Sequence, residues 1–239
     1  TKETAAICNR ESGIGADGLI RIGKKDGKWF MDYRNADGSI AEMCGNGIRV
    51  MAKYLVANGH QPEGIFAIDT RDGLKHLKVP MDGDISVNMG QVRDEEMKIQ
   101  ASANGHFFDG YNINVGNPHA VVFVDDLAKV GELKNEPIIR PRDAYPEGVN
   151  VEFVQELGDH KLAMRVFERV VGETQSCGTG TVAVALAATI KSGEKLPSKW
   201  EINPPGGRLF VEIDPHSNAI LTGPTELIKE VDVSSYLRN

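Results

Sequence analysis

The sequence predicts an α+β fold made of two pseudo-symmetric units, each a curled antiparallel sheet or barrel wrapped around a central buried helix. Three observations predict it: an internal repeat, a helix that is apolar nearly all round, and short alternating segments on both sides of each helix. Because a helix without a polar face must be buried, a curled sheet around it is the simplest arrangement for a strand-rich chain.

The repeat emerges when the sequence is compared with itself at an offset of 133 residues, without gaps over 31–90 and 164–223. The matching pairs are Met31/Met164, Cys44/Cys177, Gly45/Gly178, Gly47/Gly180, Ala52/Ala185, Gly73/Gly206 and Gly90/Gly223. Glycines in register indicate turns and close backbone approaches in register. We therefore expect an N-terminal unit over 1–90, to which a last strand at about 226–239 can return, and a C-terminal unit over 91–225. Tight packing of the two units around a cleft is expected.

Each copy has the same predicted order of elements. A strand over 29–34, or 162–167, leads through a glycine-containing loop to a cysteine and a helix, over about 45–58 and 178–191. The second helix is apolar on all faces over 181–190, and Asn58-Gly59 and Ser192-Gly193 supply the C-terminal stops. Turn residues separate further strands, expected at 74–79, 84–89, 121–124, 151–154, 209–213, 219–221 and near 231–233.

Composition excludes several classes of function. The net charge is −7 and no basic run is longer than Lys24-Lys25, so neither nucleic acid nor an anionic membrane is an expected partner. No apolar run approaches 18 residues, and the start has no signal-peptide pattern. Three cysteines do not make a disulfide framework, which favours a reducing cytoplasm. The segment Gly13–Gly18 has Gly-x-Gly-x-x-Gly spacing but is not expected to open a helix, so we do not interpret it as a dinucleotide-binding motif.

The paired cysteines carry the chemical signal. Cys44 is followed by Gly-Asn-Gly and Cys177 by Gly-Thr-Gly, each before a predicted helix. A helix N-terminus favours a thiolate, and glycines there leave backbone N–H groups open to an anion. A lone cysteine is more often a small buried hydrophobic residue. Two matched thiols suit inversion at a carbon beside a carboxylate, where one sulfur removes a proton and the other returns one to the opposite face.

Longer motifs around these cysteines resemble the diaminopimelate epimerase family. They are Phe30–Ser39, Glu42–Gly47, Gly116–His119, Gly148–Val151 and Glu168–Gly180, and Gly13–Gly18 and Thr222–Pro224 fit the same family. The resemblance implies a homodimeric, cytoplasmic isomerase of the diaminopimelate epimerase-like fold that needs no cofactor and no metal. Its implied reaction converts LL-diaminopimelate to meso-diaminopimelate, in lysine and peptidoglycan-precursor biosynthesis.

The resemblance also implies the roles of individual residues. Cys44 and Cys177 are the acid and base, Glu168 binds the distal ammonium and stands near Cys177, and His119 stands near Cys44 as a proton relay. The backbone N–H groups that bind the reacting carboxylate are those of Gly45, Asn46, Gly178 and Thr179. The side chains that hold the distal, non-reacting amino acid head are Asn35, Asn117, Asn150 and Arg169.

Other interpretations stay open at this stage. Glu168-Arg169 fits an ordinary surface pair, and Asn35, His119 and Asn150 fit turn residues. One alternative function is a proline racemase or hydroxyproline epimerase-like enzyme, although those relatives usually carry His at the position of Asn46. Another is a non-catalytic, truncated binding protein with a redox-sensitive cysteine pair. The family also opens with a strand whose Asn contributes to the substrate site; the sequence from Thr1 does not include this strand, which either lies before Thr1 or is absent.

Overall fold

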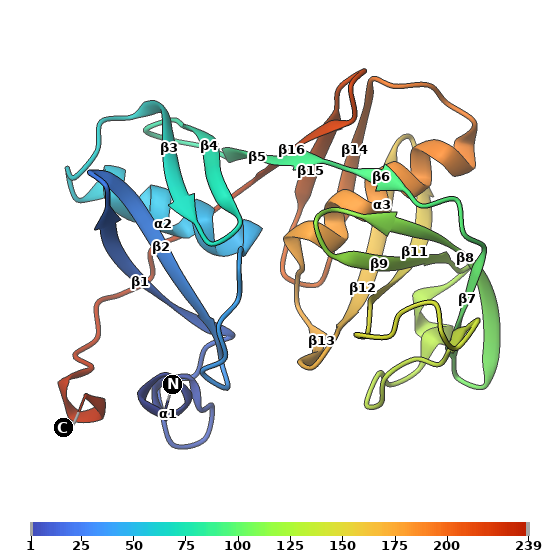
Figure 1. Cartoon of the computed structure of the whole chain (residues 1–239), viewed down its shortest axis with the longest axis horizontal. Helices are drawn as coiled ribbons and strands as arrows, with labels where there is room; N and C mark the ends of the chain where they lie inside the picture. Colours follow the sequence, from blue (N-terminus) through green and yellow to red (C-terminus); the bar gives the residue numbers. More distant parts are fainter. Residues whose placement is uncertain (1, 238–239) are drawn as a thin grey trace. The chain divides into compact units, whose positions relative to one another are not determined.

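The computed structural model describes residues 2–237, and the chain forms two compact units. Unit 1 comprises Thr1–Val87 with Thr225–Asn239, and unit 2 comprises Asn88–Pro224. Both units combine strands with one main helix, which confirms the predicted α+β class (Figure 1). Within residues 2–237, no helix is long and apolar enough to cross a membrane.

Unit 1 is a sheet with one amphipathic helix against it. Its strands are β1 (Gly18–Lys25), β2 (Lys28–Asn35), β3 (Gly64–Thr70), β4 (Gly73–Val79) and β5 (Ile85–Gln91), in that spatial order, with β5 continuing into unit 2. Its helices are α1 (Lys2–Cys8) and α2 (Gly45–Ala57). Asp26 and Gly27, at φ 50° and 76°, form the tight turn between β1 and β2. Helix α2 buries Ile48, Met51 and Leu55, whereas Tyr54 remains 39% exposed.

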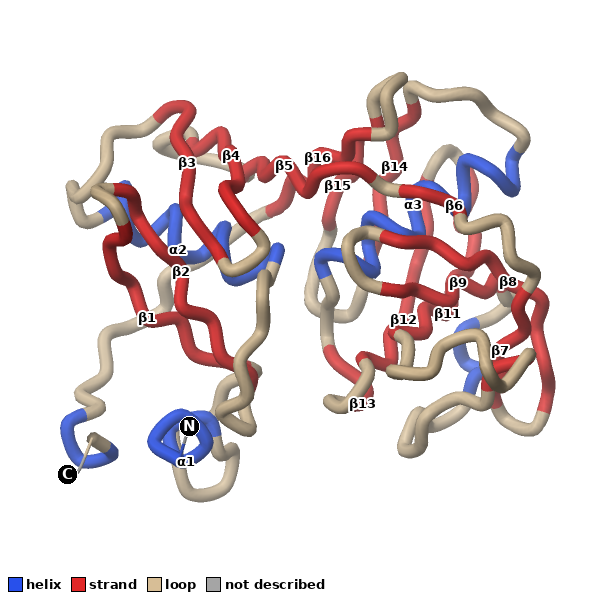
Figure 2. The backbone as a smooth tube through the Cα atoms, viewed as in Figure 1, coloured by secondary structure: helices blue, strands red, loops and turns tan. Residues whose placement is uncertain are grey.

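Unit 2 wraps its strands around a helix that has no exposed face. The strand order is β16-β15-β14-β12-β11-β9-β8-β7-β10, and β13 pairs with β12 and β6 with β8. Residues Thr181 to Thr189 of α3 (Gly178–Ser192) expose 7% or less of their surface, because strands of this order from β16 to β8 contact the helix (Figure 2). The remaining elements are β6 (Arg93–Asp94), β7 (Ile99–Ala103), β8 (His106–Asn114), β9 (Pro118–Phe123), η1 (Leu127–Val130), β10 (Ile139–Arg140), β11 (Asn150–Gly158), β12 (Lys161–Glu168), β13 (Gly172–Thr174), β14 (Ser198–Asn203), β15 (Leu209–Ile213) and β16 (Asn218–Gly223).

The internal repeat is visible element by element. An offset of 133 residues carries the bounds of β2, 28–35, onto those of β12, 161–168, and the start of α2 at residue 45 onto the start of α3 at 178. The same offset carries β5, 85–91, to 218–224, against 218–223 for β16. Each copy is therefore a hairpin, a helix and a three-stranded meander, which positions one cysteine at the same point of each unit.

Two expectations about the strands need correction. The sheets are mixed rather than antiparallel, because β2 pairs with β3, β12 with β14 and β9 with β11 in parallel. In the first two pairs a helix crossover returns the chain in the same direction. The expected strand near 231–233 does not form among residues 226–237, where only the short helix η2 (Ser234–Tyr236) is regular. Its alternating pattern meets no buried face, since Ile228 is 85% and Val231 45% exposed.

Candidate active site

Both cysteines occupy the residue immediately before a helix. Cys44 has extended backbone angles, φ −137° and ψ 112°, and its sulfur accepts a hydrogen bond from the Gly47 N–H at 3.3 Å. Cys177 is similarly extended, with φ −121° and ψ 120°. The first helical bonds are Ile48 N–H to Cys44 O and Thr181 N–H to Cys177 O, both at 2.9 Å. The backbone N–H groups before Ile48 and before Thr181 have no backbone acceptor within the helix. Each helix start is therefore suited to bind an anion.

The surroundings of Cys44 in unit 1 contain a buried cation. Arg49 is 3% exposed, and its Nη1 donates to Gly45 O at 3.2 Å. Burial lowers the pKa of Arg49 to about 10, and a Cys44 thiolate interacts favourably with the guanidinium. The Arg49 Nε has no hydrogen-bond partner among residues 2–237. Arg49 is not among the residues predicted from the sequence, although a cation on the buried face of an apolar helix is an available signal.

Asn35, also in unit 1, lies at the end of β2 in a turn. Its Nδ2 donates to Ser39 Oγ at 3.0 Å, and its backbone N–H donates to Ser39 O at 3.0 Å. These contacts match the turn-forming interpretation. Its predicted contact with a distal amino acid head stays a prediction.

The surroundings of Cys177 in unit 2 are acidic. The Glu168 carboxylate, at the end of β12, accepts a hydrogen bond from Thr174 Oγ1 at 2.5 Å and lies beside the Cys177 thiol. Burial, reinforced by the carboxylates of Glu168 and Glu152, raises the pKa of Cys177 well above its usual value. Burial also raises the pKa of Glu168, against the opposing effect of its hydrogen bonds. Cys177 is therefore a protonated thiol at neutral pH, beside the predicted Glu168.

Replacing Glu168 by glutamine is expected to lower the pKa of Cys177. The substitution removes a negative charge that opposes thiolate formation, so Cys177 deprotonates at a lower pH. The rate of Cys177 alkylation by iodoacetamide, followed against pH by peptide mass spectrometry, measures the shift. Glu173→Gln is the matched control, because Glu173 pairs with Arg165 at 2.7 Å on the exposed surface. An unchanged or raised midpoint in Glu168→Gln would contradict the charge coupling.

A chain of polar side chains links Cys177 to the interior of unit 2. Thr179 Oγ1 lies 3.5 Å from the Cys177 sulfur and accepts from Asn117 Nδ2 at 3.4 Å. Asn117 Oδ1 is 3.0 Å from His119 Nε2, and His119 Nδ1 is 2.7 Å from Glu152 Oε1. His119 and Glu152 are both fully buried. The structure thus brings the predicted Asn117, His119 and Thr179 together, with a carboxylate that the sequence analysis did not identify.

Asn150 and Arg169 meet at the edge of the same group. Asn150 on β11 is 3% exposed, and its Oδ1 accepts from the Arg169 backbone N–H at 3.0 Å. This bond fixes the chain where β12 ends and the tight turn into β13 begins. Most of the predicted site residues therefore lie in unit 2 around the start of α3: Asn117, His119, Asn150, Glu168, Arg169, Cys177, Gly178 and Thr179.

The turn after Arg169 holds a strained residue. Val170 has φ 67°, in the left-handed region that β-branched side chains avoid, and is 93% exposed. Val170→Gly is expected to stabilise the protein by about 1 kcal/mol, since relief of strain exceeds the added entropy of the unfolded chain. Urea unfolding measures this change. Val171→Gly, at a neighbouring exposed residue without positive φ, should instead destabilise; equal destabilisation by both variants would refute the strain.

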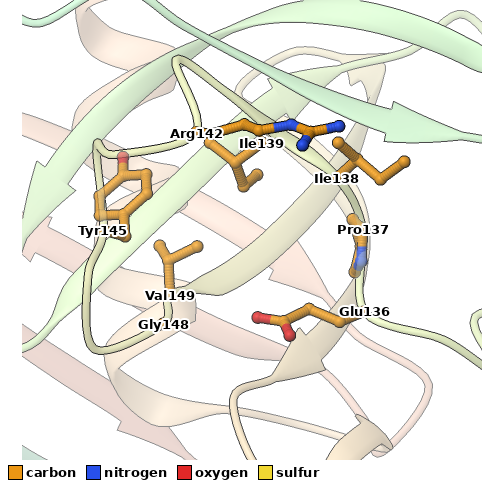
Figure 3. A pocket seen from close by; sticks show the side chains of 8 residues that line it. All are labelled: Glu136, Pro137, Ile138, Ile139, Arg142, Tyr145, Gly148 and Val149. Carbon is orange, nitrogen blue, oxygen red and sulfur yellow. The ribbon is translucent and has the colours of Figure 1, made fainter.

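A separate cavity of about 320 Å³ lies along the segment before β11 (Figure 3). Glu136 and Arg142 supply its charged walls, and Tyr145 and Val149 part of its apolar lining. It contains none of the predicted site residues, so the hydrogen-bonded group around Cys177 defines the candidate site in this unit. Among residues 2–237, no group of three or more His, Cys, Asp or Glu side chains is arranged to hold a metal ion.

Solved structures share this architecture. A hydroxyproline epimerase from Agrobacterium vitis matches with a TM-score of 0.67 at 17% identity, over 92% of this chain and 76% of that one. A phenazine biosynthesis protein of the PhzF family from Bacillus anthracis matches with a TM-score of 0.68 at 13% identity, over 88% and 82%. The fold and the two cysteine-capped helices therefore place the chain in the class of duplicated α+β proteins that contains epimerases.

Comparison with sequence relatives identifies one family within this class. The family model described as diaminopimelate epimerase matches residues 1–94 and 111–228. The diaminopimelate epimerase of Streptomyces coelicolor is 42% identical, over 97% of this chain and 86% of the relative, and that of Thermobifida fusca is 41% identical, over 96% and 87%. The chain belongs to the diaminopimelate epimerase family. Likeness to a hydroxyproline epimerase extends only to the fold.

Proposed function

We propose that the chain is an isomerase that epimerises LL-diaminopimelate to meso-diaminopimelate with two thiols and no cofactor. One observation carries the chemistry: each repeat places a cysteine at the start of its helix, and the two lie in opposite charge environments. The guanidinium of Arg49 accompanies Cys44, whereas the carboxylates of Glu168 and Glu152 accompany Cys177. From these environments we assign the role of base to Cys44 and the role of acid to Cys177.

The reaction then needs one base and one acid on opposite faces of one carbon. The Cys44 thiolate removes the α-proton, the C–H electron pair moves into the carboxylate as an enolate, and the Cys177 thiol protonates the other face. Backbone N–H groups at the helix starts stabilise the developing negative charge. After one turnover Cys44 is the thiol and Cys177 the thiolate, which is the state that catalyses the reverse reaction.

The second amino acid head sets the substrate class. The residues proposed to hold it are Asn35, Asn117, Asn150, Glu168 and Arg169, because amides and an ion pair together match an ammonium and a carboxylate. A substrate without this head would leave such groups unpaired. The family resemblance implies that His119 is a proton relay for Cys44, whereas within unit 2 its ring nitrogens bond Glu152 and Asn117. We also propose that the protein is a cytoplasmic homodimer and that it acts in lysine and peptidoglycan-precursor synthesis.

Turnover of LL-diaminopimelate tests the function directly. Chiral chromatography should detect meso-diaminopimelate in a reaction under reducing conditions, with no product from L-proline or trans-4-hydroxy-L-proline. Turnover of the two proline substrates instead would favour the alternative epimerase. Stable protein that converts none of the three would defeat the proposal.

A further inference from the structure

Glu152 is a buried carboxylate without an assigned role. It lies on β11 between Val151 and Phe153, and it is fully buried. Its Oε1 contacts His119 Nδ1 at 2.7 Å, and its Oε2 has no hydrogen-bond partner among residues 2–237. A buried carboxylate is unfavourable unless it is paired, so the contact with His119 is its principal compensation.

The start of α3 is shaped to admit this carboxylate. A Cβ atom on Gly180 would lie 2.5 Å from Glu152 Oε1, a distance that no side chain tolerates. Glu152 therefore lies against the first turn of α3, where the helix dipole favours a negative charge. Gly180 makes room for a carboxylate rather than only for substrate.

The hydrogen bonds from Glu152 to Cys177 have a defined direction. Asn117 donates through Nδ2 to Thr179, so its Oδ1 faces His119 Nε2, and only an N–H at that nitrogen can satisfy it. A second proton then lies in the hydrogen bond between His119 Nδ1 and Glu152 Oε1. A carboxylate at Nδ1 holds the imidazole in this state and orientation.

We propose that Glu152 is a positioning residue: through His119 and Asn117 it orients the Thr179 hydroxyl, and thereby the Cys177 sulfur. It touches neither the substrate nor the reacting carbon. The inference rests on the proposed epimerase function. It assigns to Glu152 an indirect role in that reaction, which is exerted through His119, Asn117 and Thr179.

The coupling between substitutions at Glu152 and Asn117 distinguishes a positioning role of Glu152 from a role in packing alone. Glu152→Gln keeps the shape of the side chain but removes its charge, and we expect kcat to fall on the order of 10²-fold because the thiol is misplaced. In an Asn117→Ala background the same substitution should have almost no further effect, since the link is already broken. Multiplicative losses would indicate packing alone and overturn the proposal. Glu156→Gln, at an exposed residue of the same strand bonded to Lys191, should leave kcat unchanged.

Thiol reactivity provides a readout independent of turnover. Cys177 is faced by Glu168 from β12, Glu152 from β11 and, through Asn117 and Thr179, His119 from β9. Glu152→Gln should move the midpoint of Cys177 alkylation to lower pH. If the wild type fails to turn over diaminopimelate but this shift occurs, the proposed function fails while the link from Glu152 to Cys177 stands. If Glu152→Gln has a normal kcat and an unshifted pH midpoint of Cys177 alkylation, the link from Glu152 to Cys177 is overturned while the proposed function stands.

The wild-type protein offers a test that needs no variant of Glu152. In nitrogen-15 NMR spectra, the N–H of the His119 ring should be found on Nε2, because Asn117 Oδ1 can only accept. An Nε2 without a proton overturns the proposed direction of the chain, whether or not Glu152→Gln folds.

Discussion

Replacing Cys177 by alanine is expected to lower the epimerisation rate by about 10³-fold, within the range of general acid–base catalysis. The variant retains the helix and the N–H groups but has no acid on one face of the substrate carbon. Cys44→Ala should cause a loss of the same order, because the reaction needs both thiols. Steady-state kinetics with LL-diaminopimelate measures both effects.

The two single-cysteine variants should differ in the chemistry that they keep. In Cys177→Ala the Cys44 thiol group, acting as the base, can remove and return a proton on its own face, so LL-diaminopimelate should exchange its α-hydrogen in D₂O without inversion. In Cys44→Ala the protonated Cys177 thiol should support little such exchange at neutral pH. Cys8→Ala is the matched control, since Cys8 is a buried cysteine of α1 that is 3% exposed and outside the proposed site. Near-normal epimerisation by either Cys44→Ala or Cys177→Ala would refute a two-thiol mechanism.

Gly180→Ala should reduce both activity and stability. The new Cβ would meet Glu152 Oε1 at 2.5 Å, and overpacking of this kind costs about 1–3 kcal/mol, partly offset by the better helix propensity of alanine. A shift of Glu152 should propagate to Cys177, so we expect kcat to fall on the order of 10²-fold. Thermal unfolding and kinetics together measure the two effects.

Two other glycines provide graded controls for Gly180→Ala. At Gly47, the matching residue of unit 1, a Cβ would lie 3.3 Å from both the Cys44 sulfur and Ile20 Cδ1, so a milder loss is expected. At Gly23 in β1, no described atom lies within 4 Å of the position that a Cβ would take, and Gly23→Ala should be close to neutral. Equal effects at the three glycines would contradict a specific conflict with Glu152.

Local sequence patterns were sufficient to predict the two main helices, α2 and α3, and the repeat, but not the short helices α1, η1 and η2. The predicted strand over 162–167 lies within β12, and the predicted helix starts at 45 and 178 are those of α2 and α3. Glycines and cysteines in register, together with an all-apolar helix, report constraints that act within one element. The position of each cysteine before its helix could be predicted for the same reason.

Long-range partners could not be predicted in this way. Glu152 lies in a segment whose apolar residues dominate the pattern, although Asn150 and Glu152, two residues apart, share one face of β11. That this face meets Gly180 and His119 depends on the parallel pairing of β9 with β11, which spacing does not reveal. The prediction of a strand near 231–233 was wrong, because alternation of apolar and polar residues alone does not show whether a buried face exists.

Isotope incorporation early in the reaction tests the central claim most directly. In D₂O, two separate thiols should give meso-diaminopimelate with one deuterium at the inverted carbon, while unreacted LL-diaminopimelate keeps its hydrogen, because the proton removed on one face never returns on the other. Mass spectrometry of the separated isomers reports both values. Meso product that retains the α-hydrogen of the substrate would show that a single base serves both faces, and would contradict the two-thiol mechanism.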